Sequence, residues 1–418
     1  MSFQQGLSGL NATSKNLSII GNNIANANTF GSKSARAEFG DMYARALNGT
    51  GASQIGIGTN LQTVAQQFTQ GNITTTENKL DLAINGSGFF QVADPGGVVS
   101  YTRNGQFKLD REGFLVSNSG LQLIGYAADD LGVVQPGLAV PLRLPTAGIA
   151  PAETNEIEME ANLDARAGSR PAAVPRITFT DPLTYNNATS QTVYDTRGQG
   201  VAVTYYFQKS AADTWNVFAT ANGATVGGTP ADPQPVGTIN FDPAGGRPTV
   251  RTLTFSITNP GPNQAGTAPM PIANLTLDIS RMTQYGAPFA VTDLTQDGYA
   301  PGQLSDILIE PGGLVMAAYS NGQSKPAGQI ELATFRNPQG LQAQGGNVWQ
   351  RTFAAGDPIV GVPAEGNMGV LQSGALEESN IDLTGELVNM ITAQRMYQAN
   401  AQTIKTQDQV LQTLVNLR

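Results

Sequence analysis

The last stretch of the chain, Asp382 to Arg418, carries the pattern that most limits how this protein can fold. Alternating steps of four and three residues from Leu383 follow an almost continuous apolar stripe, which is the pattern of a coiled-coil helix. Asp382 stands directly before the stripe and is suited to cap the first helical turn. Such a helix has one apolar side that needs a partner. The predicted seam comprises Leu383, Leu387, Met390, Tyr397, Ala401, Ile404, Leu411 and Val415.

Residues 1–28 repeat the same spacing at the other end of the chain. No proline precedes Pro95 or follows Pro363, so nothing breaks a long helix at either end. One amphipathic helix is usually explained by packing on its own core, but two charge-poor stripes at opposite termini favour packing between copies. We therefore expect the two ends to be poorly ordered in a single molecule and to fold on assembly. The N-terminal seam comprises Phe3, Leu7, Leu10, Leu17 and Ile24.

Composition excludes several classes of function. Charged residues are only 13% of the chain and the net charge is −9, which argues against nucleic acid or an anionic membrane as the main partner. Cysteine and histidine are both absent, which excludes disulfides, Cys/His zinc sites and histidine-based catalysis. We predict no catalytic residue, no cofactor, no metal and no enzyme activity. A two-carboxylate glycosidase is compatible with the composition, but adjacent pairs such as Glu377 and Glu378 do not face each other.

Between the two ends, the spacing of apolar residues changes to a period of two at Leu80. The pairs Asn85-Gly86 and Asn104-Gly105 stand between apolar runs in this region. Asn-Gly in that setting predicts β-hairpins. After a proline-rich boundary, short strands separated by turns indicate an all-β barrel or sandwich. Beyond Phe289 the first pattern returns. We expect residues 32–47 to be irregular or helical, the Gly56-Gly58 stretch to be an extended connector, and residues 223–235 to form a surface loop.

The chain is therefore predicted to be mainly β with α-helical coiled-coil termini, and to consist of nested domains. An outer β-rich domain, a barrel or sandwich, is inserted in an inner hairpin-rich β domain, and the two ends form a helix pair. The predicted divisions are an axial coiled coil (1–30 and 380–418), connecting segments (31–74 and 364–379), the inner β domain (75–145 and 290–363) and the outer β domain (146–289).

Several long stretches resemble the axial proteins of the bacterial flagellum, the family of rod and hook proteins. The resemblance rests on Leu10–Lys33, Leu80–Phe90, Tyr101–Phe107 and Gly374–Tyr397. The insertion at 146–289 resembles the hook branch of this family, because rod proteins are shorter and have little inserted there. The ending from Asn400 to Arg418 is also similar to that of hook proteins. A distal rod protein is the alternative within the family, and a β-rich adhesin or polysaccharide enzyme is the alternative outside it.

The resemblance implies a structural subunit that self-assembles into a flexible curved tube, a universal joint that transmits torque from rod to filament. It implies an extracellular place in the flagellum, attached to the basal body, after type III export without a cleavable signal peptide. The implied partners are other copies of the chain, the distal rod protein, the hook cap, the hook–filament junction protein and the export apparatus. No nucleic acid and no membrane insertion are expected.

Overall fold

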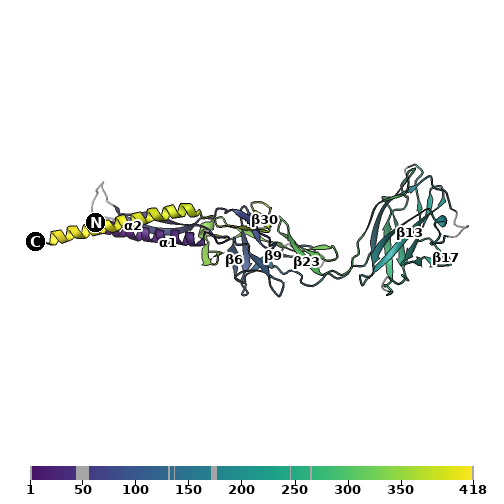
Figure 1. The fold of residues 1–418 in the computed structure, drawn as a ribbon, viewed down its shortest axis with the longest axis horizontal. Coiled ribbons are helices and arrows are strands. Elements are labelled where there is room, and N and C mark those ends of the chain that lie inside the picture. The colour runs from purple at the N-terminus through teal and green to yellow at the C-terminus, as the bar shows by residue number, and fades with distance from the viewer. Residues whose placement is uncertain are drawn as a thin grey trace. The chain divides into compact units, whose positions relative to one another are not determined.

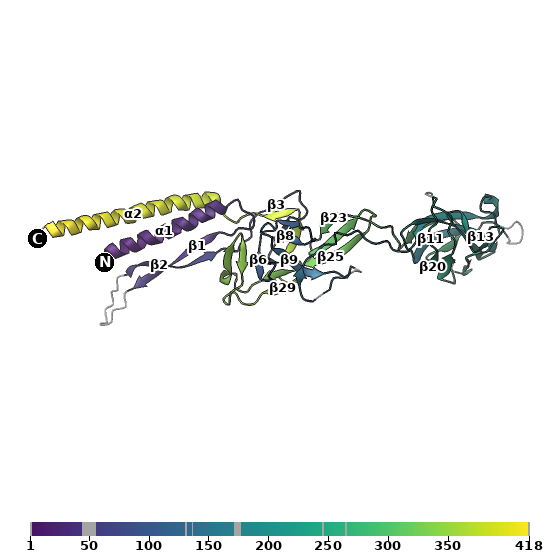
Figure 2. The same cartoon turned by 90° about the horizontal axis from the view of Figure 1, so that it is seen from below.

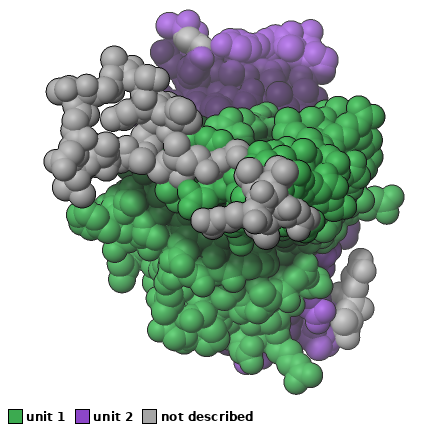
Figure 3. All heavy atoms as spheres, turned by 90° about the vertical axis from the view of Figure 1, so that its left-hand side faces the viewer, with its two compact units in different colours: residues 1–146, 306–318, 324–418 green, residues 147–305, 319–323 purple. Residues whose placement is uncertain are grey.

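The computed structural model describes residues 2–43, 56–129, 132–135, 137–170, 177–244, 246–263 and 266–416. The chain forms two compact units, which Figure 3 shows in green and purple. Unit 1 consists of residues 1–146, 306–318 and 324–418, and unit 2 consists of residues 147–305 and 319–323. The nested arrangement expected from the sequence is confirmed, because the chain leaves unit 1, builds unit 2 and returns.

The two predicted helices form the terminal part of unit 1. Helices α1 (Ser2–Asn26) and α2 (Leu383–Asn416) lie side by side and run in opposite directions (Figures 1 and 2). The N–H of Thr384 donates to Oδ1 of Asp382 at 3.0 Å, so the predicted cap of α2 is confirmed.

A long β-hairpin runs along α1. Strand β1 (Ala35–Tyr43) pairs antiparallel with β2 (Gly56–Gln66), and Ala35 stands opposite Gln66. The expectation of irregular or helical structure at 32–47 is wrong for residues 35–43, because alternation of small or apolar with charged residues suits a half-covered strand. Gly56 to Gly58 belongs to β2, and residues 44–55 lie outside the described residues.

The inner part of unit 1 is built on a 13-stranded sheet whose main path runs β23-β24-β25-β9-β5-β6-β28-β27. Its core includes Leu82, Phe90, Phe107, Leu123 and Leu332. The strands are β5 (Phe89–Ala93), β6 (Val99–Thr102), β7 (Phe107–Leu109), β8 (Leu115–Ser117), β9 (Gln122–Ala127), β10 (Val140–Pro141), β23 (Leu304–Ile309), β24 (Leu314–Tyr319), β25 (Ser324–Ile330), β26 (Leu332–Thr334), β27 (Gln342–Gly345), β28 (Val348–Gln350) and β29 (Ile359–Gly361). A short 3₁₀ helix, η2 (Pro338–Gly340), precedes β27.

Two further pairs of strands join the early part of unit 1 to its late part. Strand β3 (Ile73–Thr75) pairs with β31 (Ala375–Glu377), and β4 (Leu82–Asn85) pairs with β30 (Val370–Ser373). Both pairs are antiparallel, so the chain segment that follows α1 is hydrogen-bonded to the segment that precedes α2.

Neither Asn-Gly pair turns the predicted hairpin. Strand β4 pairs with β30 rather than β5, and β7 pairs with β8 rather than β6. Gly105 has a different role: a Cβ there would lie 1.6 Å from the carbonyl oxygen of Leu82, whose N–H donates to the Gly105 carbonyl at 3.0 Å. Here glycine is required because two main chains approach closely.

Unit 2 is a β-sandwich, which is one of the two predicted forms. Two five-stranded sheets share one core, to which Ile157 and Leu163 contribute from one sheet and Tyr205, Phe207 and Trp215 from the other. The first sheet contains β11 (Glu156–Asp164), β19 (Thr252–Ile257), β20 (Ile272–Asp278), β21 (Thr283–Tyr285) and β22 (Ala290–Gln296). The second contains β12 (Asn187–Tyr194), β13 (Gly200–Ala211), β14 (Thr214–Ala221), β15 (Ala224–Val226) and β18 (Gly237–Asn240), and unit 2 also holds η1 (Pro182–Thr184), β16 (Gly228–Thr229) and β17 (Asp232–Pro233).

One domain boundary and one loop differ from the expectation. The sequence pattern predicts the return to the inner domain at residue 290, but β22 pairs antiparallel with β11, with Gln296 opposite Ile157, so unit 2 continues to Ser305. An edge strand of one sheet and the first strand of another have the same alternation, which explains the error. The predicted loop at 223–235 contains the short strands β15, β16 and β17.

Candidate self-assembly surface

Helix α1 lies between α2 and the hairpin, and the side chains that it buries are small or polar except for Ile20. Its buried residues are Gly6, Thr13, Ile20 and Asn23. A Cβ on Gly6 would lie 3.1 Å from Cγ1 of Ile404, so glycine lets α2 approach closely. The predicted seam of α1 is a different stripe, in which Phe3 and Leu7 are exposed and Leu10, Leu17 and Ile24 are half-buried.

The residues of the predicted seam of α2 differ in their exposure to solvent. Met390, Ala401 and Ile404 are half-buried, whereas Leu383, Leu387, Tyr397 and Leu411 are exposed. The side chain of Val415 lies outside the described residues. The heptad pattern missed Ala393, which is buried on α2, and four further exposed apolar residues, Val388, Ile391, Met396 and Val410. Within one chain, the helix pair therefore leaves most of its large apolar side chains uncovered.

Hydrogen bonds fix the hairpin to the outer side of α1. The Gln5 side-chain amide donates to the carbonyl of Gly56 at 2.6 Å. The Ser8 hydroxyl donates to the Thr59 carbonyl at 2.6 Å and accepts from the Thr59 N–H at 2.8 Å. Because these are specific polar contacts, the hairpin holds one orientation of α1 and leaves the apolar stripe of Phe3 and Leu7 outside.

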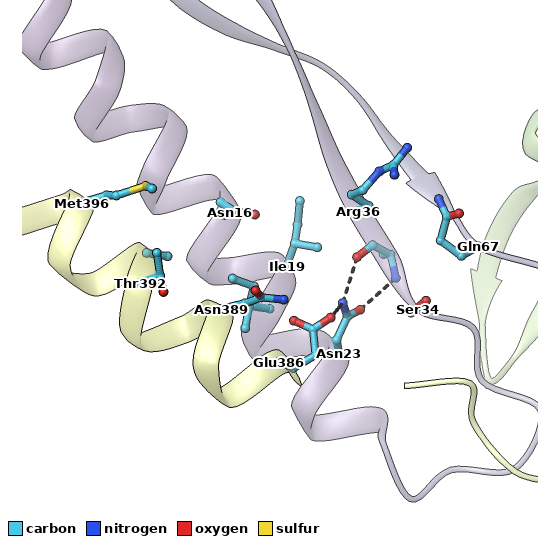
Figure 4. Close-up of a pocket in the computed structure, with 13 residues that line it drawn as sticks. Asn16, Ile19, Asn23, Ser34, Arg36, Gln67, Glu386, Asn389, Thr392 and Met396 are labelled. Carbon is cyan, nitrogen blue, oxygen red and sulfur yellow. Dashed lines mark hydrogen bonds between the residues drawn. The ribbon is translucent and has the colours of Figure 1, made fainter. Parts of the chain in front are cut away.

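Asn23 joins α1, β1 and α2 at one point. Its Nδ2 donates to the Ala35 carbonyl at 2.8 Å and to Oε1 of Glu386 at 2.9 Å, and its Oδ1 accepts from the Ala35 N–H at 2.9 Å (Figure 4). Beside it lies a cavity of about 420 Å³, lined among others by Asn16 and Thr392 from the two helices (Figure 4). The amide of Asn23 therefore acts as a three-way connection, which the heptad pattern did not single out.

A buried ionic cluster stands where the helices meet the inner β part. Glu377 accepts from Nζ of Lys33 at 2.6 Å and from a guanidinium nitrogen of Arg103 at 3.3 Å. Its Oε1 also accepts from the N–H of Gly71 at 2.9 Å. Burial lowers the pKa of Lys33 and of Arg103, and in each case the ion pair with Glu377 acts in the opposite direction. With its oxygens occupied in this way, the carboxylate is suited to holding elements together.

The described residues offer little to other kinds of site. Among them, no three acidic side chains are grouped so that they could hold a metal ion. No helix in the described part of the chain combines the length and the apolar character that crossing a bilayer requires. The exposed apolar stripes on α1 and α2 are therefore the strongest candidate for a functional surface.

Four family models match segments of the chain. "Flagella basal body rod protein" matches residues 3–33, and "Flagellar hook protein FlgE/F/G D1 domain" matches residues 83–163. "Flagellar basal body protein FlaE D2 domain" matches residues 162–299, and "Flagellar basal body rod FlgEFG protein C-terminal" matches residues 372–417.

Curated relatives match over the full length. The flagellar hook protein FlgE of Salmonella typhimurium is 41% identical over 438 residues, and that of Escherichia coli is 39% identical over 438 residues, each covering 100% of both chains. The FlgE of Borreliella burgdorferi is 29% identical over 455 residues, covering 100% of this chain and 99% of its own. The crystal structure of the Helicobacter pylori flagellar hook protein FlgE2 shares the fold, with a TM-score of 0.53 at 16% identity over 73% of this chain and 100% of that chain.

Proposed function

The chain belongs to the family of bacterial flagellar hook proteins, and on that premise we propose that its predicted helical seam is the surface through which copies polymerise. It is a structural subunit of the hook and a part of the flagellum, and its family polymerises into the hook. A rod protein is not favoured, because the full-length relatives are hook proteins. These relatives are structural proteins, and the absence of cysteine and histidine supports the proposal that this chain is not an enzyme.

One observation carries the proposal: α1 has two separate stripes with different chemistry. The buried stripe around Gly6 and Asn23, small or polar except for Ile20, contacts its own α2 and hairpin, whereas Phe3 and Leu7 of the apolar stripe remain exposed. A stripe already used inside the chain is not free to bind a neighbour. We propose as the interface the whole predicted seam, in which Ile404 also contacts Gly6 of its own chain, so that exposed members such as Leu7 and Leu387 are the ones free to meet a neighbour. The seam comprises Phe3, Leu7, Leu10, Leu17 and Ile24 of α1 and Leu383, Leu387, Met390, Tyr397, Ala401, Ile404, Leu411 and Val415 of α2.

Burial of apolar side chains is the energy that such an interface offers to assembly. Each large apolar side chain that leaves water contributes roughly 1.5–3 kcal/mol as an upper bound. One face of a subunit that contacts a different face of the next generates an open helical array when the rotation between subunits does not close a ring. Several seam residues covered in every subunit would stabilise a long polymer, although a single helix pair is marginal.

The finer functions implied by the resemblance are part of the proposal. We propose that the polymer is a flexible curved tube that acts as a universal joint and transmits torque from rod to filament. The subunit is proposed to lie outside the cell after type III export without a cleavable signal. Its further proposed partners are the distal rod protein, the hook cap, the hook–filament junction protein and the export apparatus, with no nucleic acid and no membrane insertion.

The interface is tested by replacing Leu7 and Leu387 together with asparagine and following polymerisation by sedimentation and electron microscopy. Both side chains are exposed, so the monomer should keep its circular dichroism spectrum while fibre formation is strongly reduced. Gln398→Asn, an exposed polar change on the same helix, is the matched control and should polymerise normally. Polymerisation of the double variant at the wild-type concentration would contradict the proposal.

A further inference from the structure

Phe353 stands apart from the terminal helices and is fully exposed, at 103% of its reference area. It lies in unit 1, in the loop between β28 and β29. Two more exposed apolar side chains, Ile359 and Val360, follow on β29, which among the described strands pairs only with β26. We call residues 353–360 the knob segment.

The turn that carries Phe353 is held rigidly. The Thr352 hydroxyl donates to the Gly340 carbonyl at 2.5 Å, and the Asn337 side-chain amide donates to the Ala354 carbonyl at 3.0 Å. The N–H of Gly356 donates to the carbonyl of Phe353 at 3.3 Å. These hydrogen bonds fix the backbone of the turn, and the turn places the Phe353 ring in solvent.

The base of the turn is anchored in the core. Ala355 is buried in a cluster with the aromatic rings of Phe89, Phe335 and Trp349. The side chains of Arg351 and Asp357, which flank the turn in sequence, form an ion pair with each other, so their charges cancel. The knob segment therefore presents exposed apolar side chains together with one exposed ion pair whose charges cancel.

We propose that a second copy of this chain buries Phe353 in the assembled polymer. This rests on the proposed function but concerns a surface outside the terminal helices. An apolar knob with no net charge fits a partner of low charge density, and this chain has only 13% charged residues. In a helical polymer a contact joins two different surfaces, so Phe353 meets a part of the neighbour other than that neighbour's Phe353.

The absence of cysteine provides a clean test. The Phe353→Cys variant carries a single thiol, and its rate of maleimide labelling is compared in monomer and polymer. We expect labelling in the polymer to be slower by about tenfold or more, and to recover when the polymer is dissociated. Phe353→Gln should raise the critical concentration for polymerisation by about tenfold, and Phe353→Leu by less, because leucine retains most of the buried apolar area.

The outcomes separate this proposal from the one on which it rests. If wild-type polymer forms and the thiol of the Phe353→Cys variant labels equally fast in both states, the knob contact is overturned while polymerisation through the helices stands. If Phe353→Gln polymerises at the wild-type concentration, the contact is also overturned. Failure of wild-type protein to polymerise at all would overturn both. A Phe353→Cys or Phe353→Gln monomer that unfolds at the wild-type midpoint but polymerises poorly supports the contact.

Discussion

Replacing Glu377 with glutamine removes the carboxylate that, within the described part of the chain, pairs with both Lys33 and Arg103. Both side chains of the Lys33–Glu377 pair are 0% exposed, and that of Arg103 is 6% exposed, so water cannot replace the lost charge. Removing one partner of a buried ion pair costs about 3–5 kcal/mol, because it leaves an uncompensated charge inside the protein. Two cations share this carboxylate, so we expect the free energy of unfolding of unit 1 to fall by an amount toward the upper end of that range.

The assay is urea unfolding of the purified monomer. Trp349 lies in unit 1 and Trp215 in unit 2, so fluorescence reports on both units. Glu377→Gln should lower the midpoint of the unit 1 transition and leave that of unit 2 unchanged. Lys79→Gln is the matched control: it breaks the pair between Lys79 and Asp306, whose side chains are 53% and 40% exposed, and a pair so open to water contributes little to stability.

The result that would refute this reasoning is equal behaviour of the two variants. If Glu377→Gln cost no more than Lys79→Gln, the cluster would not be the dry site that its geometry indicates, in which both cations depend on one carboxylate. A triple replacement of Lys33, Arg103 and Glu377 with apolar residues of similar volume should be far less costly than the single change, because no charge is left unpaired.

Three other predictions follow from particular side chains. Asn23→Ala should lower unit 1 stability by about 2–4 kcal/mol in the same assay, because the Ala35 N–H and carbonyl lose their partner, and full stability would contradict the three-way connection. Tyr205→Phe should raise the free energy of unfolding of unit 2 by about 1–2 kcal/mol, because that buried hydroxyl has no hydrogen-bond partner among the described residues; destabilisation would refute this. Burial raises the pKa of Tyr126 to about 12, aided by its hydrogen bond to Glu331, so above pH 10 the unfolded chain holds fewer protons and stability falls with rising pH. Tyr126→Phe should make this alkaline loss shallower in pH-dependent urea melts, and an unchanged slope would exclude this contribution.

Local sequence patterns were sufficient to predict the C-terminal helix of the chain. The stripe that begins at Leu383 and the cap at Asp382 predict α2 almost to the residue, because helix period and capping depend on neighbours in sequence. The sandwich strands that contain Tyr205 and Trp215 are read equally well from alternation and turns.

Contacts between distant residues could not be predicted in that way. Asn104-Gly105 has the composition of a hairpin turn, but its glycine is required by the main chain of Leu82, which no local pattern reveals. Lys33, Arg103 and Glu377 meet only because three separate segments converge. The heptad pattern located apolar side chains on α1, yet could not show that a stripe with Gly6 at one end contacts α2 in the same chain.

The pairings of β3 with β31 and of β4 with β30 have a consequence for the order of folding. Unit 1 needs residues from both ends of the chain, so it cannot be completed until the last part of the polypeptide has arrived. Unit 2 closes within residues 147–323 and has all its strands earlier. We therefore expect a chain whose N-terminus emerges first to complete unit 2 before unit 1. The pairing of the early strands β3 and β4 with the late strands β31 and β30 is then the slow step, since contacts between remote segments form late.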